Sequence, residues 1–122
     1  MNLTVLGALF GALAVIAGAF GAHALRGQLE PAMLAVYETA SRYQFFHALA
    51  LMFVGAQGPS TPRPGAARLA GILFALGIVL FSGSLFALVF TRFTLWGAVT
   101  PFGGLAFIAG WIVVARAWWS RA

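Results

Sequence analysis

The chain has 122 residues, of which 62% are apolar and only 7% charged, and its mean hydropathy is +0.98. A water-soluble domain carries about 25% charged residues, so water is not the main solvent of this protein. The net charge of +5 comes from arginines that stand apart rather than in a run, so we expect no nucleic-acid partner. The absence of cysteine excludes disulfides, thiol nucleophiles and thiolate metal sites.

Three uninterrupted apolar stretches are each long enough to cross a bilayer as a helix, which takes about 20 residues. They run from Leu3 to Leu25, from Leu69 to Phe90 and from Trp96 to Ala115. Ala22-His23-Ala24 imitates a signal-peptide cleavage site, but no basic residue precedes the first stretch, and its apolar segment is longer than a signal core. We therefore expect an uncleaved first helix over about residues 3–25.

A second helix is expected over about residues 31–56. Arg26 to Glu30 ends the first apolar stretch, and Pro31 suits the first position of a helix, where its missing N–H costs no hydrogen bond. The segment Gln57 to Gly65 contains three prolines and two glycines, so it is predicted to form a central turn rather than a helix. The chain is thus expected to divide into two helix pairs around this turn, without a domain boundary.

The second pair consists of a third helix over about residues 66–90 and a fourth over about residues 96–119. Thr91 to Thr94 connects them, and Pro101 is an alternative first residue for the fourth helix. The predicted fold class is all-α, an integral membrane bundle of four transmembrane helices that forms a single domain over residues 1–122. Its first partner is accordingly the lipid bilayer.

The arginines near the helix ends favour one orientation in the membrane. With helices that alternate in direction, the side of the termini and central turn carries Arg63, Arg68, Arg116 and Arg121, and the opposite side carries Arg26, Arg42 and Arg92. Cytoplasmic segments hold the excess of basic residues in membrane proteins. We therefore expect both termini in the cytoplasm.

Small residues in the first helix follow a regular spacing. Gly7, Gly11, Ala14, Gly18 and Gly21 are separated alternately by four and three positions. They therefore share one side of the helix, where a neighbouring backbone can approach closely. Two interpretations remain open, namely packing against another helix of the same chain and the contact surface of a homo-oligomer.

The first half of the second helix is unusually polar. Between Glu38 and His47 polar side chains project on every side, so this segment cannot face lipid all round. Either it belongs to a full, tilted transmembrane helix, or only residues 43–56 are immersed and the rest lies in the headgroup layer. Glu38 and Arg42 have the acid-first i,i+4 spacing of an intrahelical ion pair.

Helix rise, counted from the central-turn side, places several polar residues at one depth. At about 1.5 Å per residue, residues 42–44 lie about 18 to 21 Å deep, and Ser82 and Ser84 lie about 20 to 22 Å deep. Glu38, Thr100 and His23 lie one to two turns further, at about 27 to 30 Å, and His47 lies at about 14 Å. Together, the candidate binding layer comprises His23, Glu38, Arg42, Tyr43, Gln44, His47, Ser82, Ser84 and Thr100.

Two interpretations of this polar layer are open. In the first, the layer is a pocket in which Arg42 contacts an anion, Glu38 is the counter-ion and His23 is a pH-sensitive gate. In the second, the same groups satisfy one another through hydrogen bonds between helices. The two interpretations differ in what a variant of Arg42 would lose, either ligand binding or stability.

The chain carries no pattern typical of an enzyme or a metalloprotein. Its two histidines and two acids lack the HExxH spacing of a zinc site, and it contains neither a serine nucleophile elbow nor a phosphate-binding loop. We therefore predict no catalytic residue, no metal and no cofactor, and the sequence gives no support to an enzymatic activity.

Several short strings occur in a characteristic order along the chain. They are Gly18-Ala19-Phe20-Gly21-Ala22-His23, Tyr43-Gln44-Phe45-Phe46-His47-Ala48-Leu49-Ala50, Phe81-Ser82-Gly83-Ser84-Leu85, Thr100-Pro101-Phe102-Gly103-Gly104 and Ala109-Gly110-Trp111. In these motifs the chain resembles, over nearly its whole length, the YgdD-like family of small bacterial inner-membrane proteins of unknown function, which has mitochondrial relatives in animals. The resemblance implies a four-span protein in a bacterial plasma membrane, and it implies no substrate, cofactor or catalytic residue.

Two functions are compatible with these patterns. One is a protein that binds or transports a small polar molecule, ion or lipid headgroup at the intramembrane polar layer. The other is a non-catalytic structural or accessory subunit that packs with itself or with a larger membrane complex. Flux in proteoliposomes would indicate the first function, and co-purification with a stable partner would indicate the second.

Overall fold

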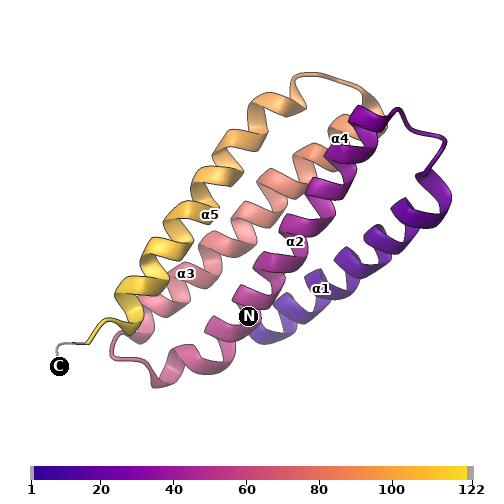
Figure 1. Ribbon diagram of the computed structural model, residues 1–122. Coiled ribbons are helices and arrows are strands. Elements are labelled where there is room, and N and C mark those ends of the chain that lie inside the picture. The colour runs from indigo at the N-terminus through magenta and orange to yellow at the C-terminus, as the bar shows by residue number, and fades with distance from the viewer. Residues whose placement is uncertain (1, 121–122) are drawn as a thin grey trace.

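The computed structural model describes residues 2–120, and within that range the chain is built from helices and short loops (Figure 1). The all-α prediction is therefore confirmed. Wider π-helical turns, η1 and η3, continue the helices that precede them. In chain order the elements are α1 (Leu3–Phe20), η1 (Gly21–Leu25), α2 (Pro31–Gln57), the short 3₁₀ turn η2 (Gly58–Ser60), α3 (Pro64–Gly77), η3 (Ile78–Ser82), α4 (Gly83–Thr91) and α5 (Trp96–Trp118).

Three continuous helical segments within residues 2–120 are long and apolar enough to cross a membrane. They are Leu3–Leu25, Pro64–Thr91 and Trp96–Trp118, with mean hydropathies of 2.3, 2.6 and 1.9. The other long helix, α2, has 27 residues, but the polar residues of its first half make it less apolar. The chain thus combines three apolar candidate spans with one long helix of mixed character.

Prolines stand near the start of both helices in the second pair. α3 begins at Pro64, two residues earlier than predicted, because proline in the first helical turn loses no intrahelical hydrogen bond. α5 begins at Trp96 and keeps Pro101 inside the helix. Of the two starts that the sequence left open for this helix, the structure has the earlier one.

The helices pack in a row rather than in a closed ring. α1 packs along α2, and α2 packs against the continuous helical segment that α3, η3 and α4 form. α5 packs against the other side of this segment. Figure 1 shows α5, α3, α2 and α1 side by side in this order. α1 and α5 therefore occupy the outer positions, and α2 has neighbours on both sides.

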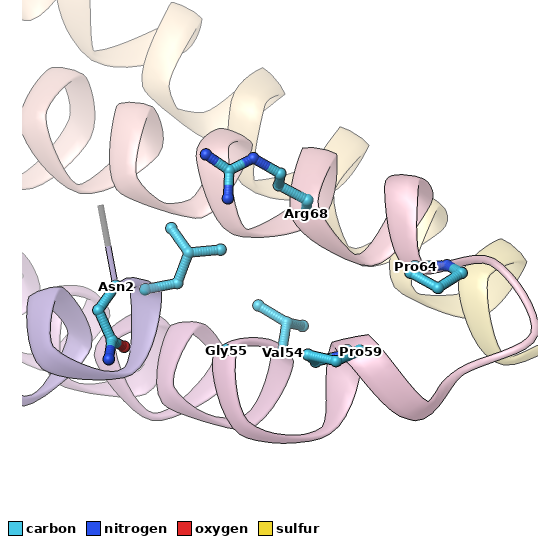
Figure 2. A pocket seen from close by; sticks show the side chains of 8 residues that line it. Asn2, Val54, Gly55, Pro59, Pro64 and Arg68 are labelled. Carbon is cyan, nitrogen blue, oxygen red and sulfur yellow. The ribbon is translucent and has the colours of Figure 1, made fainter.

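Both described chain ends lie beside the central turn (Figure 1). Arg63 Nη1 donates hydrogen bonds to the carbonyl oxygens of Arg116 and Trp119, at 2.9 and 2.7 Å, and so ties the turn to the end of α5. Arg121, which was counted in the charge balance, lies outside the described residues. An open groove of about 440 Å³ is found at this end (Figure 2), lined by Asn2, Leu3, Val54, Gly55, Gly58, Pro59, Pro64 and Arg68.

The small residues of α1 and η1 face α2. We call the contact of α1 and η1 with α2 the polar seam. A methyl group added at Gly7 would lie 2.7 Å from Met52 Cγ and 2.8 Å from the Ala48 carbonyl oxygen, and one added at Gly21 would lie 2.5 Å from Tyr37 Cε1. The backbones therefore approach closely, and a helix of the same chain covers the stripe. Of the other members, Ala14 is buried, and methyl groups added at Gly11 and Gly18 would lie 3.8 Å from Ala48 Cβ and 3.3 Å from Ser41 Oγ.

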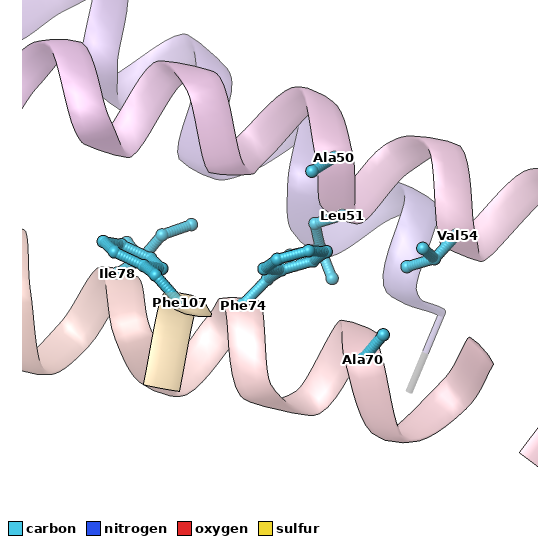
Figure 3. Packing of buried hydrophobic residues seen from close by; sticks show 7 residues of the cluster. All are labelled: Ala50, Leu51, Val54, Ala70, Phe74, Ile78 and Phe107. Atoms are coloured by element: carbon cyan, nitrogen blue, oxygen red, sulfur yellow. The ribbon is translucent and has the colours of Figure 1, made fainter. Parts of the chain in front are cut away.

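The contact of α3 and η3 with α5, which we call the aromatic seam, relies on rings packed over glycines. A methyl group added at Gly110 of α5 would lie 2.7 Å from Cε1 of Phe74 in α3. In the opposite direction, Phe107 of α5 lies against Gly77 of α3 so closely that a Cβ there would overlap the ring. Both rings belong to the apolar cluster of Figure 3, which consists of Ala50, Leu51, Val54, Ala70, Phe74, Ile78 and Phe107.

Large apolar side chains also cover the outside of the molecule. Exposed examples on the four long helical segments include Leu9, Ile16, Phe46, Phe53, Val79, Leu105 and Ile112. An exterior of this composition is unfavourable in water, since soluble monomers rarely expose large contiguous apolar patches. The outside of the fold therefore has the character that hydrocarbon requires.

Candidate functional site

The inner face of α2 carries a ladder of polar side chains that bond to the backbone of α1. Its members are spaced by four and three residues, so they lie on one side of the helix. Because α1 runs antiparallel, their acceptors fall at positions that decrease along α1. The bonds run from Tyr37 Oη to the Ala17 carbonyl at 2.6 Å, from Ser41 Oγ to the Ala14 carbonyl at 2.9 Å and from Gln44 Nε2 to the Phe10 carbonyl at 2.9 Å.

His47 connects α2 with α5 and has a defined tautomer. Trp111 Nε1, which can only donate, lies 3.0 Å from His47 Nε2, so that nitrogen is the acceptor. His47 Nδ1 then carries the proton, and this N–H donates a hydrogen bond to the Tyr43 carbonyl oxygen at 2.8 Å. The imidazole also stacks on Phe107 with 3.6 Å between ring centroids. Both ring nitrogens are therefore engaged, which leaves neither of them free to bind a metal or haem.

The serines of η3 and α4 likewise bond to neighbouring helices. Ser82 Oγ donates to the Ala40 carbonyl of α2 at 2.7 Å, and the Ser82 side chain is fully buried. Ser84 Oγ and Thr100 Oγ1 lie 2.5 Å apart and join α4 to α5. Through these bonds, α2 and α5 are each fastened to the helical segment between them.

Four of the predicted layer residues have exposed side chains that make none of these bonds, namely His23, Glu38, Arg42 and Tyr43. The predicted ion pair between Glu38 and Arg42 is absent from the described structure. The salt bridge found within residues 2–120 joins Arg92 and Glu30 instead, at 3.6 Å, with both side chains exposed.

The difference between the inner and outer residues comes from rotation about the helix axis. Arg42 and Gln44 are two residues apart, which turns their side chains by about 200° at about 100° per residue. Gln44 therefore faces α1, and Arg42 points away from the other helices. We call the exposed side around Arg42 the outer face of α2; it comprises Ala35, Glu38, Arg42, Phe45, Phe46, Leu49 and Phe53.

The nine predicted residues thus fall into two sets. Gln44, His47, Ser82, Ser84 and Thr100 take part in bonds between helices, whereas His23, Glu38, Arg42 and Tyr43 have exposed side chains. Sequence reasoning missed Tyr37, Ser41 and Trp111. The regular spacing of Tyr37, Ser41 and Gln44 on one helical face was the pattern that could have indicated the ladder.

The charge distribution separates the two ends of the molecule. Arg63, Arg68 and Arg116 lie at the central-turn end, whereas both acids of the chain, Glu30 and Glu38, precede or belong to the first half of α2. The groove in Figure 2 therefore opens on an end that is basic throughout its described part. Among residues 2–120, no group of three or more side chains with metal-binding chemistry gathers in one place.

The fold and these contacts define a small, all-helical protein with an apolar exterior and polar bonds between its helices. Residues 17–104 match the family described as "Protein of unknown function (DUF423)", and the chain belongs to this family. The predicted resemblance to an uncharacterised family of membrane proteins is thereby confirmed.

The chain is also similar to curated bacterial membrane proteins. It is 44% identical to "UPF0382 membrane protein YwdK" of Bacillus subtilis over 113 residues, which cover 93% of this chain and 92% of that protein. It is 44% identical to a UPF0382 membrane protein of Staphylococcus haemolyticus over 110 residues, covering 90% and 88% of the two chains. No solved structure matches the chain. These relatives support a membrane protein and carry no stated activity.

Proposed function

We propose that the protein crosses the bacterial inner membrane four times and acts as a non-catalytic accessory subunit, which binds another membrane-embedded chain through the outer face of α2. The observation that carries this proposal is the division of polar groups on α2. The inner polar side chains bond to neighbouring helices, whereas Glu38 and Arg42 have exposed side chains and form no ion pair with each other.

A transmembrane α2 is supported by its length and its neighbours. Its 27 residues make a helix of about 40 Å, enough for the hydrocarbon core when tilted. Tyr37, near its start, packs edge-to-face on Phe86 and Phe90 of α4, at centroid distances of 5.2 and 5.9 Å. The first half of α2 therefore lies alongside an apolar candidate span, which favours the full helix over an interfacial one.

The described arginines support cytoplasmic termini. Arg63, Arg68 and Arg116 lie at the end with the termini, and Arg26 and Arg92 lie at the opposite end. Arg42, which the sequence count assigned to the opposite end, lies well inside α2 and is not part of either end. The end with more basic residues faces the cytoplasm in most membrane proteins. A C-terminal reporter that is active only outside the cytoplasm would contradict this orientation.

Arg42 is costly in lipid, and another protein chain would offset that cost. It lies about 17 Å from the start of α2 and about 22 Å from its end, far from the ends where long basic side chains reach the interface. An arginine at the centre of a transmembrane helix costs about 2.5 to 3.5 kcal/mol on insertion scales. An acid of a neighbouring chain at that depth would pair with Arg42 and offset part of this penalty.

A pocket that binds or transports a small polar molecule has less support. Gln44, His47 and Ser82 donate to backbone carbonyls of this chain rather than pointing into a shared cavity. Glu38 and Arg42, the charged members of the predicted layer, lie on the outer face of α2. The inner polar groups therefore fit hydrogen bonds between helices better than a ligand site.

Two variants separate the roles of the inner and outer faces, Arg42→Leu and Gln44→Leu. Membranes that contain the tagged full chain are solubilised in mild detergent, and the size of the native complex and the melting temperature of the monomer are measured. We expect Arg42→Leu to disperse the complex while the monomer keeps its stability, because the Arg42 side chain points away from the other helices of its own chain.

The matched control, Gln44→Leu, should lower monomer stability and leave the complex in place. An accessory role is contradicted if the wild-type chain has no protein neighbour by cross-linking in native membranes. Substrate-dependent flux in proteoliposomes that Arg42→Leu abolishes would also contradict it.

A further inference from the structure

The outer face of α2 carries charges that complement a copy of itself. Glu38 and Arg42 both have exposed side chains, have opposite charge and lie four residues apart, yet they form no ion pair within the chain. Resting on the proposed function, we infer that the partner on this face is a second copy of the chain, with Glu38 of each copy paired to Arg42 of the other.

Two copies inserted in the same orientation place their α2 helices parallel around a twofold axis along the membrane normal. Equal residues then lie at equal depth, and residues four apart differ in depth by about 6 Å. The long arginine side chain spans that offset. A twofold interface uses the same surface on both copies, so each Glu38–Arg42 contact occurs twice.

The other outer residues follow the seven-residue repeat of a parallel helix pair. Ala35, Arg42, Leu49 and Ala56 recur every seven positions, and Glu38 and Phe45 are seven positions apart beginning three residues later. This is the a and d spacing of a left-handed pair. The small alanines at both ends of the repeat allow close approach, and the apolar side chains between them shield the ion pairs from lipid.

A second copy satisfies these requirements without further assumptions about the partner. A different protein would need an acid and a base in the same order, at the same depth and on an apolar helix. A second copy presents all three at the correct depth. The two reciprocal pairs lie away from water, where interactions between charges are strongest.

Charge reversal tests the reciprocal pairing in the full chain. With Glu38→Arg each chain presents two bases at the interface, and with Arg42→Glu each chain presents two acids there. Self-association of each single variant, measured by energy transfer between labelled chains in phospholipid vesicles, should weaken about tenfold or more. Co-expression of the two single variants should restore association, because each acid then faces a base in the other chain.

The double variant E38R/R42E completes the test. It should associate with itself as the wild type does, and it should fail to associate with the wild type, because like charges would then face each other. The inference is overturned if the co-expressed single variants do not associate and the double variant does not associate with itself. Monomeric single variants alone would not support the inference, because poor folding would also make them monomeric.

Cross-linking gives a second measurement that leaves the charges intact. The chain has no cysteine, so Leu49→Cys introduces the one thiol of the protein. Leu49 is 52% exposed on the outer face, and the control Leu13→Cys lies on α1 with 56% exposure. We expect a disulfide-linked dimer under oxidation with Leu49→Cys and none with Leu13→Cys. Equal cross-linking of both variants would overturn the inference.

The outcomes also separate this inference from the proposed function. A wild-type chain that is monomeric in vesicles but held by a different protein in native membranes would overturn the second copy and retain the accessory role. A chain with no protein neighbour in either setting would overturn both.

Discussion

The polar seam and the aromatic seam both bring helix backbones into close contact over small residues, but they hold the helices with different side-chain chemistry. In the polar seam, hydroxyl and amide groups of α2 bond to carbonyls of α1. In the aromatic seam, Phe74 and Phe107 fill the space above the glycines that face them. The polar seam therefore depends on the direction of its hydrogen bonds, whereas the aromatic seam depends on the volume of its side chains. The two seams should respond differently to substitution.

The largest effect is expected where a side chain would meet backbone. A Cβ at Gly103 of α5 would overlap the backbone nitrogen of Phe81, which cannot rotate away as a side chain can. Gly103→Val should therefore force α5 away from η3 and lower the free energy of unfolding by about 3 kcal/mol or more. Unfolding titrations in mixed detergent micelles measure the change.

The matched control for this substitution is Gly97→Val, because nothing lies within 4 Å of a Cβ at Gly97. A similar loss of stability in both variants would show that valine acts through helix propensity rather than through the aromatic seam.

A smaller effect is expected for an alanine in the polar seam. The added methyl of Gly7→Ala would lie 2.8 Å from the Ala48 carbonyl oxygen, whereas that of Gly11→Ala would make an ordinary contact of 3.8 Å with Ala48 Cβ. Gly7→Ala should cost about 1 to 3 kcal/mol, and Gly11→Ala should be close to neutral. If the melting temperatures in detergent fall equally, the close approach at Gly7 is not what limits this seam.

The bond between His47 and Trp111 should contribute an intermediate amount. Trp111→Phe keeps an aromatic ring but leaves His47 Nε2 without its donor. Hydrogen bonds between membrane helices contribute about 0.6 kcal/mol on average and at most about 1.7. A double-mutant cycle of Trp111→Phe with His47→Phe should give a coupling energy in that range, whereas a coupling of zero would mean that stacking alone holds this site.

The smallest effect is expected for one member of the ladder on α2. Ser41→Ala removes the bond to the Ala14 carbonyl while leaving the packing nearly unchanged, so the expected loss is about 0.6 kcal/mol. The exposed Ser60 in η2 provides the control, since Ser60→Ala should change stability by less. A loss above about 2 kcal/mol for Ser41→Ala would mean that the ladder acts cooperatively.

The all-helical fold could be predicted because it depends on properties that a sequence displays directly. Long apolar stretches and a proline-rich turn indicate helices and their connections. The predicted central turn over Gln57 to Gly65 was too long. Gln57 belongs to α2, Gly58–Ser60 form a 3₁₀ turn, and α3 already begins at Pro64. Proline suits both a turn and the first position of a helix, so the backbone path is needed to assign Pro64.

The candidate site was less predictable because depth along a helix can be counted, whereas rotation about its axis depends on the neighbouring helices. Arg42 and Gln44 lie at nearly the same depth and on opposite sides of α2. The partners of Tyr37 and Ser41 are backbone carbonyls, which every residue carries. Hence a sequence does not mark which carbonyl accepts the bond.

The wide turn η3 has a geometric consequence for the helical segment from Pro64 to Thr91. The buried residues Ile78 and Ser82 lie four positions apart, a step that drifts by about 40° in a regular α-helix. A π-helical turn holds more residues per turn, so the drift across this step is smaller within η3. Ile78 and Ser82 can therefore share one side of the segment, where Ser82 Oγ reaches the Ala40 carbonyl of α2.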